Sequence, residues 1–517
     1  MALQLKKILI SDEVDQKCVD ILRENGLEVV KDTSLAGDKG KLIAEIQKYD
    51  GLIVRSATKV TSDVIKAAIS LKIIGRAGTG VDNIDCDAAT KQGIVVMNTP
   101  GGNTISAAEL TCTMILAMSR HVCQGTLSLR DGRWERKKLL GNEVSGKTLA
   151  IVGLGRIGEK VAERMQCFGM RTIGYDPIIP GEVSAKFGVE WISLEDLWPQ
   201  ADYITVHTPL IPQTKDLLND DVFSKCKKGV RIINCARGGI IDEDALLRAL
   251  RSGQCGGAGL DVFAQEPPTN MELIQHPLVT CTPHLGANTN EAQCRVAEDI
   301  ALQFVDAMKG RSLFGAINAQ ALSNALSPLT KPWVMLATAL GKIAAATGHS
   351  NGPLTIETQG AGLSKSAGYL SAAIFVGLLH SESNNHLNLV SAPALAKKLQ
   401  LKTDLKHQDG EVEQIKLSAA DLCLVGTIGG ATVPLLISIN GQQLAQGVQL
   451  TGNMLLLKTV PNKQPLADII RAVGSGLMSF VSSVQDSSIW YICQLASPLS
   501  ELGPVKAVVD KAYPVTI

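Results

Sequence analysis

The chain has 517 residues, enough for about three domains at roughly 150 residues each. Hydrophobic residues make up 45% and charged residues 19%, as in ordinary globular proteins. Fifty Lys and Arg balance fifty Asp and Glu, so overall charge does not favour binding to nucleic acid or to an anionic membrane.

Short apolar runs alternate with helical patterns from the N-terminus onward. The expected strands are KKILI (6–10), GLEVV (26–30), DGLIVR (50–55), LKIIG (71–75) and GIVVMN (93–98), and helices are expected over 14–26, 39–49, 62–70 and 86–92. A long buried helix over 104–122 is expected to close this block. The alternation predicts a parallel sheet with helices on both faces.

A second series of the same kind begins after GNEVSGK. Its expected strands are TLAIVG (148–153), MRTIGYD (170–176), YITVHT (203–208), RIINCA (231–236), GGAGLDVF (256–263) and LVTCTP (278–283). Residues 1 to about 315 are therefore predicted to form two Rossmann-like, doubly wound α/β domains. A cleft between two such domains is the usual place for a small-molecule site.

The pattern changes beyond residue 316. Residues 422–440 are uncharged and contain three Gly and one Pro, which favours two buried strands over a membrane helix. Residues 453–517 read strand, helix, strand, strand, helix, strand, with the helices over 465–476 and 502–512. That order predicts a ferredoxin-like unit at the end of an α+β extension.

The strongest motif is Gly153-Leu-Gly155-Arg156-Ile157-Gly158, between an apolar strand and a helix. The first Gly permits a tight turn, the second lets the backbone approach a pyrophosphate, and the third lets helix and strand pack closely. Asp176 ends the next strand and would accept hydrogen bonds from the adenosine ribose. Because a carboxylate there repels a 2′-phosphate, NAD is predicted rather than NADP.

A second glycine loop, Gly78-Thr79-Gly80, follows the strand LKIIG, but Asn83 replaces its third Gly. Its backbone N–H groups would suit a carboxylate at the mouth of the cleft. A simple turn explains the residues equally well.

Three chemically distinctive residues follow strands of the second series: Arg237, Glu266 and His284. His is the natural base for a hydroxyl proton near neutral pH, and a carboxylate on its other nitrogen orients the ring. Arg binds a carboxylate through two parallel hydrogen bonds. His207 also ends an apolar strand and is expected to shape the cofactor wall. No metal site is expected.

The motifs GLGRIG with Asp176, NCARGG, LDVFAQEPP and TPHLGA, in this order, resemble the D-isomer-specific 2-hydroxyacid dehydrogenase family. RSATKV (55–60), GRAGTGVDNID (75–85), WERKK (134–138), GYDPII (174–179) and the long extension resemble the animal branch of that family that oxidises 3-phospho-D-glycerate. The likeness is dense over residues 5 to about 320 and thinner beyond, although INAQAL (317–322) still fits.

The resemblance implies that Arg237, Glu266 and His284 are catalytic. It implies NAD contacts at Thr79, Gly153, Gly155, Arg156, Ile157, Gly158, Asp176, Thr208, Cys235, Ala236, Arg237, Asp261, His284, Leu285, Gly286 and Ala287. Asp261 would hold the nicotinamide carboxamide. The resemblance also implies a discontinuous first domain. The predicted regions are residues 1–100 with 286–316 for substrate, 101–285 for NAD, 317–452 for regulation or assembly, and 453–517 as an ACT-like domain.

The substrate of that branch carries a carboxylate and a phosphate, so cationic and polar ligands are expected. The candidates are Arg55, Gly80, Asn103, Arg136 and Arg237, with Lys59 weaker. Arg136 lies in RDGRWERKK, which would otherwise be a solvated charged helix face. We expect this segment to reach a second copy of the chain in a dimer or tetramer, with Trp134 as its anchor and Arg136 completing the neighbour's phosphate site.

The Pro-Gly turn of ACT domains appears here as Gln464-Pro465-Leu466. Without the Gly, close backbone approach to a small amino acid is lost, which argues against serine feedback inhibition. The unit would then serve assembly.

The implied activity is NAD-dependent oxidation of 3-phospho-D-glycerate to 3-phosphohydroxypyruvate, the first step of L-serine synthesis. A glyoxylate or hydroxypyruvate reductase of the same family and an NADH-sensing corepressor with this fold are the alternatives. Twelve Cys without a C-x-x-C motif, together with an N-terminus that lacks a signal-peptide pattern, favour the cytosol.

Overall fold

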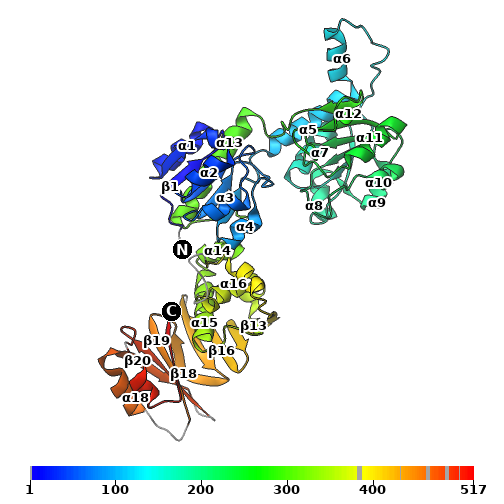
Figure 1. Ribbon diagram of the computed structural model, residues 1–517. Coiled ribbons are helices and arrows are strands. Elements are labelled where there is room, and N and C mark those ends of the chain that lie inside the picture. The colour runs from blue at the N-terminus through cyan, green and yellow to red at the C-terminus, as the bar shows by residue number, and fades with distance from the viewer. Residues whose placement is uncertain (1–2, 381–386, 431, 461–465, 484–487, 500) are drawn as a thin grey trace. The chain divides into compact units, whose positions relative to one another are not determined.

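The computed structural model describes residues 3–380, 387–430, 432–460, 466–483, 488–499 and 501–517. The chain forms two compact units, one of residues 1–98 with 300–517 and one of residues 99–299 (Figure 1). Within the described residues, none of the helices is long and apolar enough to cross a membrane.

A five-stranded parallel sheet forms the first part of the first unit, in the order β2-β1-β3-β4-β5. Its elements are β1 (Lys7–Ile10), α1 (Gln16–Glu24), β2 (Glu28–Lys31), α2 (Lys39–Ile46), β3 (Gly51–Val54), α3 (Ser62–Ala67), β4 (Ile73–Arg76), α4 (Cys86–Lys91) and β5 (Val95–Asn98). Strands β3, β4 and β5 are buried and uncharged apart from the last residues of β4 and β5, as expected for a sheet covered on both faces. The chain returns to this sheet within α13 (Asn290–Lys309), where Ile300 and Phe304 pack against Gly75.

The second unit holds a seven-stranded parallel sheet with the order β12-β11-β10-β9-β6-β7-β8. Its strands are β6 (Thr148–Val152), β7 (Arg171–Tyr175), β8 (Glu190–Trp191), β9 (Tyr203–Val206), β10 (Val230–Asn234), β11 (Cys255–Leu260) and β12 (Val279–Cys281). The strand order reverses between β6 and β9, which is where Rossmann sheets bind dinucleotides. The sequence did not predict the two-residue strand β8.

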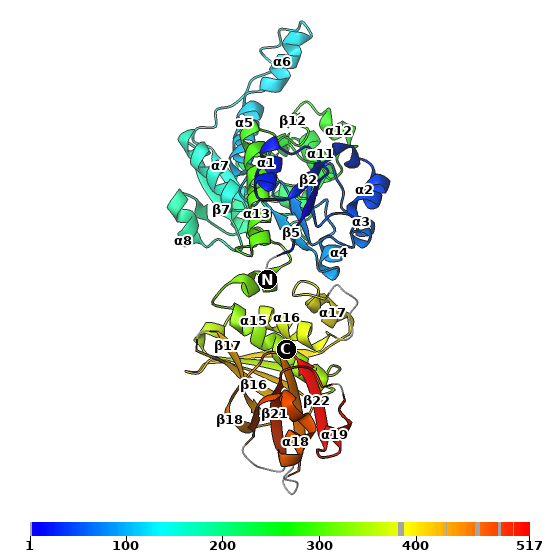
Figure 2. The same cartoon turned by 90° about the vertical axis from the view of Figure 1, so that its left-hand side faces the viewer.

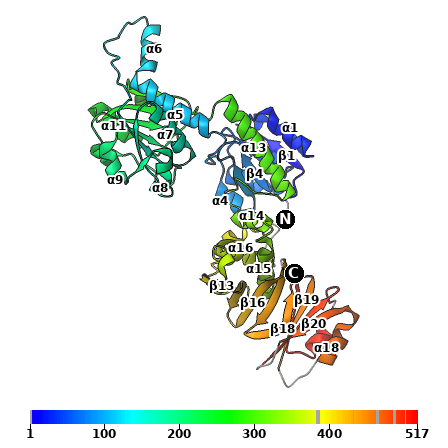
Figure 3. The ribbon, with the colours of Figure 1, turned by 180° about the vertical axis from the view of Figure 1, so that it is seen from behind.

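Helices cover both faces of this second sheet. The helices of this unit are α5 (Thr104–Ser119), α6 (Val122–Arg130), α7 (Arg156–Cys167), α8 (Gly181–Ser184), α9 (Leu194–Leu197), α10 (Asp220–Lys225), α11 (Glu243–Ser252) and α12 (Met271–Ile274), of which α6 extends away from the sheet. The expectation that a helix over 104–122 closes the first block is wrong. Helix α5 lies beside α7 and packs on β10, β11 and β12 (Figure 3), because its apolar residues join the core of the second sheet. The helix stops at Ser119, since His121 takes a left-handed conformation (φ 52°) and α6 begins a new axis.

The extension begins with helices and a six-stranded sheet in the order β14-β13-β15-β16-β17-β18. Its elements are α14 (Gln320–Leu326), α15 (Lys331–Ala346), β13 (Leu354–Gln359), α16 (Ala367–Leu378), α17 (Ala392–Lys398), β14 (Thr403–Gln408), β15 (Gln414–Ala419), β16 (Leu422–Gly429), β17 (Val433–Ile439) and β18 (Gln442–Gln449). Helices α15 and α16 pack side by side, and α15 also packs on β16 and β17 (Figure 2). The two strands expected over 422–440 are confirmed as the antiparallel pair β16 and β17.

The last region is a four-stranded antiparallel sheet in the order β20-β21-β19-β22. Its elements are β19 (Asn453–Thr459), α18 (Leu466–Val473), β20 (Leu477–Ser482), β21 (Ile489–Leu495), α19 (Gly503–Lys506) and β22 (Lys511–Thr516). This order is that of a ferredoxin-like unit, so the predicted fold class is confirmed. The helix expected over 502–512 is only four residues long. Gln464 and Pro465 of the altered turn lie outside the described residues.

Candidate active and dinucleotide-binding site

The glycine fingerprint forms the turn between β6 and α7. Gly153 has a φ of +99°, and a Cβ there would lie 2.6 Å from the carbonyl oxygen of His207. A Cβ on Gly158 would lie 2.1 Å from the Gly153 oxygen. At Gly155, where α7 begins, a Cβ would meet no atom within 4 Å. Two glycines are thus required by packing, while the third leaves open space where a diphosphate would approach the backbone.

Asp176 follows β7 and is fixed by backbone N–H groups. Its Oδ2 accepts from Leu154 N at 2.9 Å, and its Oδ1 accepts from Ile178 N at 2.7 Å and Ile179 N at 3.0 Å. The Leu154 bond ties the carboxylate directly to the fingerprint turn. This is the position from which a carboxylate reaches the adenosine ribose in Rossmann folds.

The far wall of the turn comes from the segment after β9. Thr208 Oγ1 is buried without a hydrogen-bond partner among the described residues, and its methyl carbon would lie 3.1 Å from a Cβ on Gly153. An unpaired buried hydroxyl beside the fingerprint fits a site that a polar ligand completes. Burial lowers the pKa of His207 to about 4, so its ring is neutral at pH 7, and its Nε2 lies 3.1 Å from Thr205 Oγ1. Burial raises the pKa of Cys235 to about 12, so Cys235 is an uncharged thiol.

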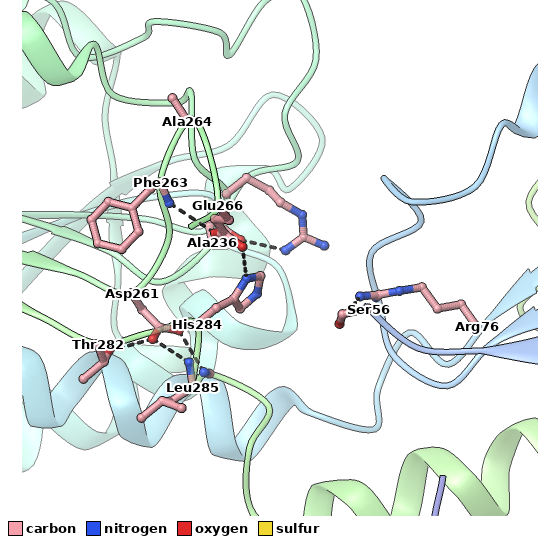
Figure 4. A network of polar contacts seen from close by, with 12 residues as sticks. Ser56, Arg76, Ala236, Asp261, Phe263, Ala264, Glu266, Thr282, His284 and Leu285 are labelled. Carbon is pink, nitrogen blue, oxygen red and sulfur yellow. Dashed lines mark hydrogen bonds and ion pairs between the residues drawn. The ribbon is translucent and has the colours of Figure 1, made fainter. Parts of the chain in front are cut away.

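His284 and Glu266 form a direct pair at the ends of β12 and β11. The distance between His284 Nδ1 and Glu266 Oε2 is 2.8 Å (Figure 4). Glu266 Oε1 accepts from Phe263 N at 3.2 Å, which holds the carboxylate in place. With Nδ1 directed at Glu266, the Nε2 atom is the one available to a substrate.

Asp261 organises the segment that carries His284. It is fully buried, and its carboxylate accepts from Thr282 Oγ1 at 2.6 Å, Leu285 N at 2.6 Å and Gly286 N at 2.8 Å (Figure 4). These bonds hold both sides of His284, whose own backbone is left-handed (φ 55°). The described contacts of Asp261 therefore position the histidine, and its contact with a carboxamide stays a prediction.

Arg237 follows β10, next to the strand that leads to Glu266. Asn234 holds this turn, since its Nδ2 donates to the Arg237 carbonyl at 2.8 Å and its Oδ1 accepts from Ala236 N at 3.0 Å. A Cβ on the next residue, Gly238, would lie 1.8 Å from the Phe263 carbonyl oxygen. The backbone of the Arg237 turn therefore packs directly on the Glu266 loop.

Glu243 supports the same loop from the first turn of α11. Its Oε1 accepts from Ala264 N at 2.6 Å. Sequence reasoning missed Glu243 and Asn234, because neither residue type at those positions signals a role until the β10 and β11 loops are seen to be neighbours.

The sequence-predicted substrate residues of the first unit lie at the carboxyl ends of its strands. Arg55 follows β3. Its Nη1 donates to the Glu13 carbonyl at 2.9 Å, and its backbone N donates to Asp12 at 2.5 Å. Burial lowers the pKa of Arg55, although the nearby acids Asp12 and Glu13 oppose the shift. Thr79 and Gly80 lie in the loop after β4, where Asn98 Nδ2 donates to the Thr79 carbonyl at 2.5 Å.

Arg76 is a further cation at this sheet edge, which was not among the residues predicted from the sequence. It ends β4, and its Nη2 donates to Ser56 Oγ at 3.1 Å (Figure 4). The signal was present in the sequence, since Arg76 follows an apolar strand in the same way as Arg55.

The other predicted residues lie in the second unit. Asn103 immediately precedes α5, and Arg156 begins α7, with Ile157 next to it. Arg136 is exposed, and Glu135 beside it pairs instead with Arg133 and Lys138. Trp134 is 82% exposed within this chain, and its role as an anchor on a second copy stays a prediction.

A seven-stranded Rossmann sheet with this fingerprint, and a histidine–carboxylate pair at the carboxyl edge of its strands, defines a dinucleotide-dependent dehydrogenase. Residues 112–286 match the family model described as D-isomer specific 2-hydroxyacid dehydrogenase, NAD binding domain. The D-3-phosphoglycerate dehydrogenases of Sus scrofa and Homo sapiens are 51% and 50% identical to this chain, and each alignment covers 98% of both proteins.

Solved structures of related proteins match about three fifths of the chain. D-lactate dehydrogenase from Aquifex aeolicus, complexed with NAD and lactic acid, has a TM-score of 0.54 at 28% identity and covers 60% of this chain and 99% of its own. The TT0316 protein of Thermus thermophilus has a TM-score of 0.54 at 36% identity with the same coverage. The chain belongs to the D-isomer-specific 2-hydroxyacid dehydrogenase family, and within it to the D-3-phosphoglycerate dehydrogenases. Its cofactor is NAD.

Proposed function

We propose that the protein oxidises 3-phospho-D-glycerate to 3-phosphohydroxypyruvate with NAD⁺, the first step of L-serine synthesis. The similarity to the mammalian relatives along nearly the whole chain supports the substrate. The observation that carries the chemistry is the 2.8 Å contact between His284 and Glu266.

The residues of the pair divide the acid–base work. His284 Nε2 takes the proton of the C2 hydroxyl while the bound nicotinamide supplies the hydride acceptor. Glu266 orients the ring through Nδ1 and stabilises the imidazolium that forms. Arg237 binds the substrate carboxylate and the reacting oxygen.

NAD is proposed to bind along the fingerprint side of the second sheet. Gly155 gives the diphosphate access to the backbone at the start of α7, Asp176 accepts from the ribose, and Thr208 offers its buried hydroxyl. Asp261, Leu285, Gly286 and Ala287 are assigned to the nicotinamide side with Cys235 and Ala236, and Thr79 is assigned from the first unit.

The anionic groups of the substrate need cations and backbone donors. We assign Arg55, Gly80 and Asn103 to them, and we add Arg76 because it ends β4 as a cation beside Ser56. Lys59 stays a weaker candidate.

The decisive experiment is a steady-state assay of the purified protein. NADH formation with 3-phospho-D-glycerate should exceed that with unphosphorylated D-glycerate by orders of magnitude in kcat/KM. Equal or faster reduction of glyoxylate or hydroxypyruvate would make the chain a reductase. Absence of turnover together with NADH-dependent retention of a protein partner would favour the corepressor.

We further propose that the chain self-associates through α6 and the segment that follows it. Helix α6 extends away from the rest of its unit (Figure 1), and Leu127, Leu129, Trp134 and Leu140 are each more than half exposed. Apolar side chains at this density are typical of an interface.

We assign a cavity on the same unit as the receptor for Trp134. A cavity of about 500 Å³ is lined by Phe263, Pro267, Pro268, Pro283 and His284, among others. If Trp134 of a second copy fills this cavity, Arg136 of that copy comes near His284, where it would bind the substrate phosphate. Trp134→Ala should then lower the mass of the particle and raise KM for 3-phospho-D-glycerate, whereas Leu140→Ala should have the smaller effect on KM. Unchanged mass and KM in Trp134→Ala would contradict the proposal.

We place the reaction in the cytosol, because all twelve cysteines are free thiols. The ACT-like domain is assigned to assembly rather than to serine binding. The regions 1–100 with 286–316, 101–285, 317–452 and 453–517 remain our proposed domain boundaries.

A further inference from the structure

Strand β14 (Thr403–Gln408) is an edge strand of the six-stranded sheet. In the described part of the chain it pairs with β13 on one side and with no strand on the other. The opposite edge strand, β18, is bridged to β20 through Leu444 and Ser483. Among the described residues, the sheet therefore has one open edge, and that edge is six residues long.

The outer backbone groups of β14 can be identified from the register. Leu354 N donates to the Lys402 carbonyl and Gly360 N donates to the Gln408 carbonyl. The backbone N–H and C=O groups of the even-numbered residues of β14 therefore point toward β13. In a parallel pair, the N–H and C=O groups of the alternate residues point the other way. Thr403, Leu405 and His407 thus present three donors and three acceptors outward.

The apolar face of the sheet continues to this edge. One row across the strands runs Leu424, Leu417, Ile356 and Leu405. The first three side chains are at most 1% exposed, whereas Leu405 is 44% exposed. The hydrophobic row therefore reaches the last strand without being closed by another residue.

The opposite face carries a row of alternating charge. Lys416 lies opposite Glu357, with their charged atoms 3.1 Å apart, and Glu357 lies opposite Lys406. The next strand in this row would be complementary if it placed an acid opposite Lys406. Asp404 lies two residues from Lys406, on the same face of β14. If β14 of a second copy were the next strand, its Asp404 would supply that acid.

We propose that β14 is a self-association edge, which pairs antiparallel with β14 of a second copy about a two-fold axis at Leu405. In this register Leu405 meets Leu405 of the other copy, and Thr403 meets His407. Both are hydrogen-bonded pairs of an antiparallel ladder, so every outward N–H and C=O group of Thr403, Leu405 and His407 finds a partner. Asp404 meets Lys406 twice, and the apolar row continues through both sheets.

Five other edge strands in the described part of the chain lack these features. The edge strands of the two parallel sheets, β2, β5, β8 and β12, are two to four residues long. Strand β22 of the ferredoxin-like unit contains Pro514, which has no N–H to donate. A lysine on an edge strand usually prevents another strand from pairing there. In the proposed pairing Lys406 lies opposite Asp404 of the second copy, which favours β14 of a second copy over strands of other proteins.

Complementary charge variants test the pairing. Asp404→Lys places Lys opposite Lys406, and Lys406→Glu places Glu opposite Asp404, so each variant alone should have half the number of chains per particle of the wild type. In an equimolar mixture every cross-strand pair becomes opposite in sign, and the wild-type mass should return. Sedimentation velocity or light scattering on the full-length protein measures this directly. Lys511→Glu, the same charge change on β22, is the matched control and should leave the mass unchanged.

The readout separates this interface from the one proposed around Trp134, since loss of β14 pairing should leave KM for the phosphorylated substrate unchanged. Wild-type mass in both single variants would overturn the proposal. So would a mixture that stays at half mass, or an equal loss of mass in Lys511→Glu.

Discussion

The dinucleotide-binding sheet and the six-stranded sheet of the extension differ in the direction of their strands, and this decides where their polar residues lie. In the first, the strands run parallel and all end at one edge, so Asn234, Glu266 and His284 follow or end three neighbouring strands. Glu266 contacts His284 directly, and Asn234 holds the adjacent Arg237 turn. In the second, β13, β15, β16, β17 and β18 run antiparallel to their neighbours and only the edge strand β14 runs parallel to β13, and polar residues spread along one face of the sheet.

This difference is the reason that we place the chemistry at the parallel sheet and propose the extension for assembly. Parallel strands gather loops from distant parts of the chain, which concentrates functional groups in one place. Antiparallel strands put their loops at alternate ends and leave faces and edges for contact with other surfaces. Substitutions at the carboxyl edge of the parallel sheet should therefore change kinetics, and substitutions in the extension should change stability or assembly.

Replacement of the proposed base gives the largest expected effect. His284→Ala should lower kcat by about 10³-fold, because general base catalysis typically contributes 10²–10⁴. NADH affinity, measured by fluorescence titration, should change little. His276→Ala, a histidine before β12, is the control. Comparable turnover in His284→Ala would remove the base from the mechanism.

Asp176→Ala should weaken NAD binding by roughly 10- to 100-fold, the effect of losing hydrogen bonds to a charged group. Discrimination against NADP should fall, since the carboxylate no longer repels the 2′-phosphate. Asp176→Asn keeps one acceptor oxygen but removes the negative charge. Comparing it with Asp176→Ala separates the loss of the ribose contact from the loss of the backbone hydrogen bonds. Unchanged affinity for both cofactors would rule out the ribose assignment.

The neutral His207 makes stability depend on pH. Its pKa is about 4 in the folded protein against an ordinary value of 6.5, so the unfolded chain binds the proton more readily. The stabilisation is complete above pH 6.5 and is lost as the pH falls toward 4, by at most about 3 kcal/mol. The melting temperature of wild type should therefore fall more steeply over this range than that of His207→Gln. Parallel curves would show that this histidine is not the source.

Glu243→Ala should lower kcat about 5-fold, since it removes one charge-assisted hydrogen bond from the loop that carries Glu266. Glu243→Gln retains an acceptor and should recover most of the rate. Because Glu243 acts through the loop, the effect should appear in kcat more than in KM for NAD. A loss confined to KM would mean that the loop does not position Glu266.

Gln442→Ala should have the smallest effect on kinetics and tests the extension. Gln442 accepts from Ser483 Oγ at 2.6 Å and donates to the Ser488 carbonyl at 2.8 Å, which joins β18 to the ferredoxin-like unit. Its loss should destabilise that unit by about 1 kcal/mol, measured by hydrogen exchange in β20, with kcat within a factor of two. The exposed neighbour Gln443→Ala is the control. A large drop in kcat would contradict the assignment of catalysis to the dinucleotide-binding sheet and of stability or assembly to the extension.

The sequence by itself determined the two parallel sheets and the order of the ferredoxin-like strands, because apolar runs and the glycine fingerprint are local signals that survive in any context. It also marked Arg237, Glu266 and His284, since each follows an apolar strand. Only the tertiary structure decided that α5 packs on the second sheet, because an all-apolar helix does not say which core it enters. Likewise, the roles of Asn234, Glu243 and Asp261 depend on loops that are far apart in sequence and adjacent in space. The apolar row that ends at the exposed Leu405 could be recognised only from the register of the paired strands, and no local sequence pattern contains that register.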